Sequence, residues 1–93
     1  MSFTISYHTD VVAHDIPKLS ESDRTRIRQA IETKLTESPE LFGKPLRRSL
    51  KGYRKLRVGD HRVIFQIEGS KVKIFVIQHR SVVYKKTDQR LSV

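Results

Sequence analysis

The chain has 93 residues, which suits one small domain near the lower limit for burying a useful core. It has no cysteine and its four histidines lack metal-ligand spacing, so disulfides and thiolate metal sites are excluded and no metal or other cofactor is expected. Lys and Arg number 19 against 10 Asp and Glu, and a net charge of +9 favours a polyanionic partner such as nucleic acid.

The first half of the chain predicts a strand followed by two helices. Residues 3–8 alternate apolar and polar side chains, as a half-buried strand does, and no signal peptide is expected because the amino end has no basic start followed by an apolar run. Residues 9–19 predict a short helix that Pro17 closes or redirects. Residues 20–38 predict a longer helix, capped by Ser20. Its apolar stripe consists of Ile27, Ala30, Ile31 and Leu35.

The second half predicts three antiparallel strands, at residues 53–58, 61–68 and 71–79. The dipeptides Gly59–Asp60 and Gly69–Ser70 between them are typical two-residue hairpin loops. The tail after residue 79 predicts either a short strand or a turn before a polar end. The expected fold is α+β over residues 1–93, a single domain with an N-terminal strand, a two-helix hairpin and a three-stranded antiparallel meander packed on the helices. The longest apolar run, residues 74–77, is too short to span a membrane, so we expect a soluble cytoplasmic protein.

The two hairpin loops fix the strand register, and the register assigns side chains to faces. One face is an apolar core set of Leu56, Val58, Val63, Phe65 and Ile67. The opposite face receives Tyr53, Lys55, Arg57, Arg62, Ile64 and Gln66. Strict alternation along the last strand adds Lys73, Ile77 opposite Arg62, and His79 to this charged face, and turns Arg80 away unless the strand ends or bulges.

Positive charge on this face has two interpretations. Residues 44–93 hold 14 basic and 3 acidic side chains, whereas residues 1–43 hold 5 and 7. A solvated charged surface that keeps a small protein soluble is one explanation. However, Arg57 directly across from Arg62 repels it, and no carboxylate is available on this face of the hairpin, which favours a phosphate site.

If the anion is RNA, this face also has the residues for cleavage. Attack of a ribose 2′-hydroxyl on the adjacent phosphate needs a base, positive charge for the phosphorane and an acid for the leaving oxygen. Arginine supplies bidentate charge, and Tyr53, His79 and Tyr84 are candidate acids or bases. As alternatives, a tyrosine at a sheet end is often a packing residue, and we expect His61 on the core face to be structural or at the sheet edge.

The order of elements and the motifs "GDHR" (59–62) and "HRSVVY" (79–84) resemble the RelE/ParE superfamily of type II toxins. The resemblance implies a small α+β fold whose sheet enters the ribosomal A site and cleaves mRNA without metal. It implies catalytic roles for Lys55, Arg62, His79, Arg80 and Tyr84. Under the nuclease hypothesis, RNA or phosphate contacts are expected from the surrounding basic residues Arg47, Arg48, Lys51, Arg54, Arg57 and Lys73. Arg54 points away from the cluster by alternation and is peripheral to it.

The resemblance leaves the target open. The expected activity is an endoribonuclease acting on mRNA at the 30S A site; the alternatives are a ParE-like inhibitor of DNA gyrase and a non-catalytic RNA- or antitoxin-binding module. The implied partners are a cognate antitoxin, mRNA and the ribosome. Operator DNA is expected only through the antitoxin complex, and no membrane partner is expected.

Overall fold

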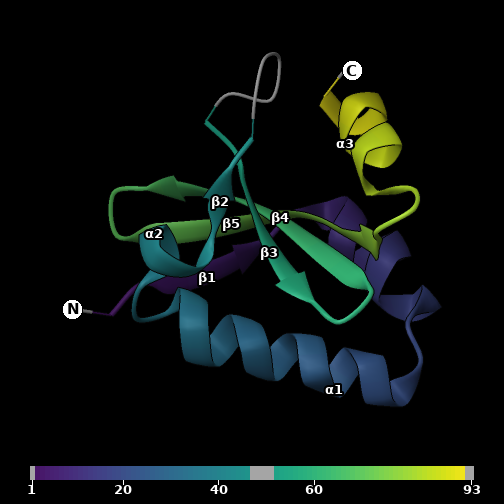
Figure 1. Cartoon of the computed structure of the whole chain (residues 1–93), viewed down its shortest axis with the longest axis horizontal. Helices are drawn as coiled ribbons and strands as arrows, with labels where there is room; N and C mark the ends of the chain where they lie inside the picture. Colours follow the sequence, from purple (N-terminus) through teal and green to yellow (C-terminus); the bar gives the residue numbers. More distant parts are fainter. Residues whose placement is uncertain (1, 47–51, 92–93) are drawn as a thin grey trace.

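The computed structural model describes residues 2–46 and 52–91, which form a five-stranded mixed sheet with helices on both faces (Figure 1). The strand order is β1-β5-β4-β3-β2. The strands are β1 (Thr4–Tyr7), β2 (Lys44–Pro45), β3 (Arg54–Val58), β4 (His61–Glu68) and β5 (Lys71–His79). Strand β1 pairs in parallel with β5, and the other neighbours are antiparallel. The predicted meander is therefore the centre of a larger sheet, and the expectation of three antiparallel strands was incomplete.

The predicted register of the β3–β4 hairpin is confirmed. Leu56 lies opposite Val63 and Arg57 opposite Arg62, on either side of the Gly59–Asp60 turn. Gly59 has a φ of 59°, a left-handed conformation that glycine adopts without steric cost and that a tight hairpin turn requires. The turn chemistry therefore sets which side chains of β3 and β4 share a face.

Strand β5 departs from the predicted register at a β-bulge. Phe65 pairs with Ile74, but the next residue, Ile64, pairs with Val76, which leaves Phe75 as the extra residue. Because a bulge inserts one residue, everything after it changes face. The prediction that Ile77 faces Arg62 was therefore wrong, and Ile77 lies opposite Val63 in the core.

The helices before the sheet differ from a two-helix hairpin. The first segment is only a π-helical turn, η1 (Val11–Asp15), and a 3-10 turn, η2 (Ile16–Lys18). The second is long, because α1 (Glu21–Ala30) continues into η3 (Ile31–Leu35), and the short α2 (Pro39–Phe42) follows. The Ser20 side chain accepts a hydrogen bond from the backbone N–H of Asp23 at 3.1 Å, which confirms the predicted cap.

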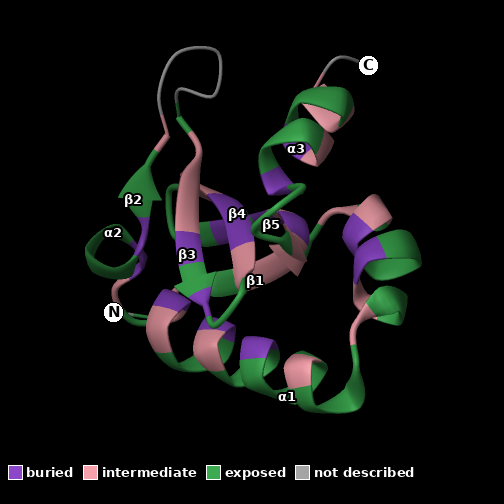
Figure 2. Ribbon diagram, turned by 45° about the vertical axis from the view of Figure 1, so that its right-hand side comes forward, coloured by how far each residue is buried: buried purple, intermediate pink, exposed green. Residues whose placement is uncertain are grey.

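The sheet has two apolar faces. On the first, which we call the α1 face, Ile27, Ile31 and Leu35 pack against the strands (Figure 2). Their strand partners are Leu56, Val58, Val63, Phe65, Val72, Ile74 and Ile77. On the second, the α3 face, a smaller cluster joins Ile64 and Val76 to Val83 of the C-terminal helix α3 (Val83–Leu91). The expected turn in the tail is confirmed at residues 80–82. The polar end after it was not predicted to be helical, and it forms α3 on the side of the sheet opposite α1 (Figure 1). Within residues 2–46 and 52–91, no helix is both long and apolar enough to cross a bilayer.

Candidate functional site

Basic side chains from three neighbouring strands share the α3 face beside helix α3. Lys55 and Arg57 are two residues apart on β3, and Arg62 on β4 lies directly opposite Arg57. Lys44 on β2 lies opposite Lys55, so it extends the same basic row. Lys44 was not predicted from the sequence, because a two-residue strand leaves no periodic signal. These cationic groups form a surface suited to a phosphate chain.

Lys55 and Tyr84 meet across the gap between β3 and the start of α3. The Lys55 Nζ donates a hydrogen bond to the Tyr84 hydroxyl oxygen at 2.9 Å. The same Nζ lies 5.6 Å from the centre of the ring, so it contacts the hydroxyl rather than the ring face. Tyr84 is 41% exposed, which leaves the pair open to a substrate. Two predicted site residues 29 positions apart are thus brought into direct contact.

The side chain of Arg62 is held at the turn between β3 and β4. Its Nη1 donates to the carbonyl oxygens of Gly59 at 3.0 Å and His61 at 2.9 Å. The adjacent carbonyl, that of Asp60, accepts the backbone N–H of Arg80 at 2.8 Å. Arg62 and Arg80 therefore lie at one corner of the sheet. A single nitrogen of Arg62 serves the turn, so its Nη2 is not required there.

His79 lies away from this cluster. The bulge at Phe75 places it opposite His61, whose other neighbour is the core residue Val58, so both histidines belong to the α1 face. Their rings are 5.7 Å apart in an edge-on arrangement. The His79 Nδ1 accepts the backbone N–H of Ser81 at 3.1 Å, which puts the proton of the neutral ring on Nε2. The prediction that His79 shares the charged face was wrong, for the same reason as Ile77.

The remaining predicted contacts divide into three groups. Arg54 lies on the opposite face and donates to the Gly43 carbonyl at 2.9 Å, so it fastens the segment after α2. Lys73 lies on the α3 face and pairs with Glu68 at 3.6 Å. Arg47, Arg48 and Lys51 lie outside the described residues. Among the described residues there is no cluster of three or more metal-ligating side chains.

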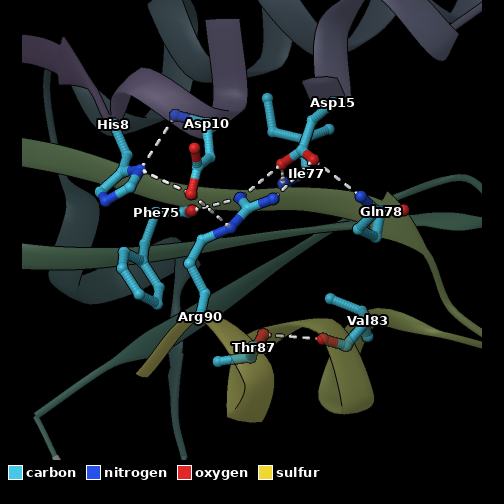
Figure 3. Close-up of polar contacts among 9 residues, drawn as sticks. All are labelled: His8, Asp10, Asp15, Phe75, Ile77, Gln78, Val83, Thr87 and Arg90. Atoms are coloured by element: carbon cyan, nitrogen blue, oxygen red, sulfur yellow. Dashed lines mark hydrogen bonds and ion pairs between the residues drawn. The ribbon is translucent and has the colours of Figure 1, made fainter. Parts of the chain in front are cut away.

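A buried ion pair that the sequence analysis missed attaches α3 to the rest of the fold (Figure 3). Arg90 donates to both carboxylate oxygens of Asp15, at 2.8 and 3.0 Å, and to the Phe75 carbonyl at 2.9 Å. Asp15 also accepts the backbone N–H of Ile77 at 2.9 Å and the side-chain amide of Gln78 at 2.7 Å. This hydrogen bonding to Asp15 raises the pKa of Arg90. The two residues are 75 positions apart and neither lies in a motif, so no local signal could have paired them.

Comparisons with known proteins agree with this fold. Residues 9–84 match the family described as the ParE toxin of type II toxin–antitoxin system, parDE. Toxin RelE of Mycobacterium tuberculosis is 33% identical over 90 residues, covering 91% of this chain and 93% of that protein.

Two solved structures illustrate the structural likeness. The toxin–antitoxin complex RelBE2 from Mycobacterium tuberculosis contains a chain of 28% identity with a TM-score of 0.80, covering 87% of this chain and 94% of that one. A double mutant of the toxin RelE of E. coli, in the free state, shares the fold at 20% identity and a TM-score of 0.71, covering 97% of this chain and 98% of that one. The sequence resemblance to this superfamily is thus confirmed, and the chain belongs to the RelE/ParE superfamily of toxins of type II toxin–antitoxin systems.

Proposed function

We propose that this toxin is an endoribonuclease that cleaves mRNA, and the contact between Lys55 and Tyr84 carries the proposal. A lysine ammonium 2.9 Å from a phenol oxygen forms a unit that can pass a proton to or from a ribose 2′-hydroxyl. Arg57 and Arg62 lie on the same face and supply bidentate charge. The reaction would be attack of the 2′ oxygen on the adjacent phosphorus, with loss of the 2′ proton to a base. The bond from phosphorus to the 5′ oxygen of the next nucleotide breaks, that oxygen takes up a proton, and a 2′,3′-cyclic phosphate remains.

Charge stabilisation would come from the basic side chains around this pair. As the phosphorane forms, negative charge builds on its oxygens, and preorganised cations on a protein surface stabilise that charge more than water does. Lys55 donates to a hydroxyl and Arg62 to carbonyls, so these contacts do not neutralise either charge. Arg80, whose backbone is fixed at the same turn as Arg62, is the second arginine of the proposed site. His79, on the other face, is left out of it.

The proposed partners follow from the family. RelBE2 from Mycobacterium tuberculosis and RelB–RelE from Methanococcus jannaschii are toxin–antitoxin complexes. We propose a cognate acidic antitoxin that neutralises the basic α3 face, and cytoplasmic mRNA in the 30S A site as the substrate. Operator DNA would be bound only through the antitoxin complex.

Mapping of RNA ends tests the activity. Brief expression of the toxin should create new mRNA 5′ ends at the cleavage sites, detected by primer extension, and the same assay with purified RNA with and without ribosomes should reveal ribosome dependence. Because the matching family model is that of ParE toxins, DNA gyrase supercoiling is assayed in parallel. Inhibited supercoiling with unchanged mRNA ends would replace the nuclease by a gyrase inhibitor. If neither effect is observed, the protein is a binding module without turnover.

Arg57 offers a prediction about binding alone, because its side chain is exposed and a change there should not disturb the fold. Arg57→Ala should weaken binding of a non-cleavable RNA by about tenfold at 0.1 M salt, since one phosphate contact is lost. The slope of log affinity against log salt should fall by about 0.7, the contribution of one contact on a single strand. Arg28→Ala on α1, on the other side of the sheet, is the control. Equal effects of the two changes would argue against RNA lying on the α3 face.

A further inference from the structure

A small recess opens on the α3 face across the adjacent strands β1, β5 and β4, beside Tyr53, which directly precedes β3. Its volume is about 180 Å³. It is lined by Ser6, Tyr7, His8, Tyr53, Gln66, Lys73, Ile74 and Phe75. Pockets for drug-sized ligands run to roughly 300–1,000 Å³, so this recess suits a single planar ring system.

Aromatic rings form one side of the recess. The bulge in β5 makes Phe75 the extra residue of its strand, and its ring lies 5.2 Å from the ring of Tyr53, tilted by 39°. The ring of His8 meets Phe75 edge-on, also at 5.2 Å. Tyr53 and Phe75 are both half-buried, so part of each ring stays accessible. Bulges commonly re-aim a side chain next to a functional site, and aromatic residues on a sheet are platforms for nucleobases.

Polar groups on the other sides have the donors and acceptors that a base edge needs. Gln66 lies opposite Lys73 in the sheet, and its amide offers both a donor and an acceptor. The His8 Nδ1 accepts the backbone N–H of Asp10 at 3.1 Å, so the neutral ring carries its proton on Nε2. The Ser6 hydroxyl and the Lys73 ammonium, which pairs with Glu68 at 3.6 Å, complete the lining.

The recess lies close to the proposed catalytic pair. Tyr53 directly precedes β3 and packs against the cluster that contains Ile64 on the α3 face, and Lys55 lies opposite Ile64 in the sheet. Two residues of extended chain span about 6.8 Å. That distance is comparable to one extended nucleotide. A strand with its scissile phosphate at Lys55 would therefore bring a neighbouring base over Tyr53.

We propose that this recess binds one nucleobase of the RNA, stacked on Tyr53 and Phe75 and hydrogen-bonded at its edge by Gln66. The inference rests on the proposed function, since it places the same RNA on the same face. It adds a base-reading contact to a surface that otherwise recognises phosphate.

Titration with a mononucleotide tests the recess without any turnover. Adding cytidine or adenosine 5′-monophosphate to labelled protein should shift the ring signals of Tyr53 and Phe75 and the side-chain amide signal of Gln66. Ribose 5-phosphate, which lacks a base, should leave these signals in place. Equal shifts with both compounds would show that only phosphate is recognised and would overturn the proposal.

Substitutions in the recess test whether it contacts a base of bound RNA. Tyr53→Leu should weaken binding of a short 2′-deoxy-substituted, non-cleavable RNA by roughly tenfold to a hundredfold, the usual cost of losing one stacked base. The same change should have no effect on an RNA that is abasic at the stacked position. Phe42→Leu, which alters a 45% exposed ring on α2, should bind both RNAs as the wild type does. If Tyr53→Leu fails to fold, Gln66→Ala replaces it, with the same dependence on the base.

The outcomes separate this inference from the nuclease. If the protein binds RNA in a base-dependent way but never cleaves it, the proposal that the recess binds a base is supported and the proposed nuclease activity is contradicted. If neither Tyr53→Leu nor an abasic site changes the rate of cleavage, the nuclease activity is supported and the proposal that the recess binds a base is contradicted.

Discussion

Replacing Lys55 by methionine should lower RNA cleavage by roughly 10²–10⁴-fold, the usual contribution of a group that moves a proton in the transition state. Methionine keeps the unbranched apolar stem but removes the ammonium that donates to the Tyr84 hydroxyl. The side chain is half-buried and its charge is not part of the core, so the fold should be retained. Single-turnover cleavage of a defined mRNA on programmed ribosomes measures the loss.

Tyr84→Phe provides the second arm of the same experiment. It removes only the hydroxyl that accepts the Lys55 hydrogen bond and keeps the ring. If the two side chains act as one unit, the double variant should be no slower than the slower single variant, because effects within a catalytic unit are not additive. Independent, multiplying losses would show that Lys55 and Tyr84 serve separate steps.

Lys34→Met is the matched control for Lys55. Lys34 is also half-buried, and its ammonium lies 5.5 Å from the ring centre of Phe42, on the α1 side of the molecule. The control makes the same change of net charge, so it should leave cleavage within about twofold of the wild type. A similar loss of cleavage in both variants would mean that overall charge, rather than the Lys55–Tyr84 contact, governs cleavage. That result would contradict the proposed site.

The β3–β4 hairpin was predictable from sequence because the composition of its turn is typical of a two-residue hairpin loop. Gly59–Asp60 fixed the register of β3 and β4, and with it the common face of Lys55, Arg57 and Arg62. The same reasoning failed beyond Phe75, because residues 74–77 are all apolar and show no alternation that assigns a face. Both faces of the sheet are buried there, which is why the run is apolar.

Helix α3 was missed because its contact stripe is mostly polar. The residues that attach it are Val83, Thr87 and Arg90, at i, i+4 and i+7, and only the first is apolar. A signal for a covering element did exist, since Ile64 is a fully buried apolar residue on a face that the sequence analysis expected to be charged and open. Buried polar residues escape periodicity arguments, because their partners are set by tertiary structure alone.

The ion pair between Asp15 and Arg90 leads to the largest expected effect on stability. Asp15 has a fully buried side chain and Arg90 is 11% exposed. Arg90→Met leaves the Asp15 carboxylate buried without its cation, and removal of one partner of a buried pair costs about 3–5 kcal/mol. For a domain of this size, that loss lowers the melting temperature by roughly 12–40 °C. Urea unfolding followed by circular dichroism measures the free energy of unfolding.

A double-mutant cycle separates this ion pair from simple loss of packing. Asp15→Asn removes the charge but keeps a side-chain carbonyl that can accept the Ile77 N–H, so the double variant Asp15→Asn/Arg90→Met should be more stable than Arg90→Met alone. Arg28→Met, at an exposed position of α1, should change the free energy of unfolding by less than about 0.5 kcal/mol. Additive losses in the cycle would show that Arg90 stabilises the fold through its stem rather than through its charge.

The same variants also test whether the ion pair supports the candidate site. Helix α3 begins with Val83 and Tyr84 near β3, and Arg90 fastens its other end to η1 and β5. If α3 detaches locally, hydrogen exchange at the amides of Val83–Leu91 should accelerate in Arg90→Met more than exchange in β4. Cleavage should then fall together with the protection of α3 and recover partly in the double variant. Unchanged protection with reduced cleavage would show that the ion pair does not act on cleavage by holding α3, because the helix would still keep Tyr84 beside Lys55.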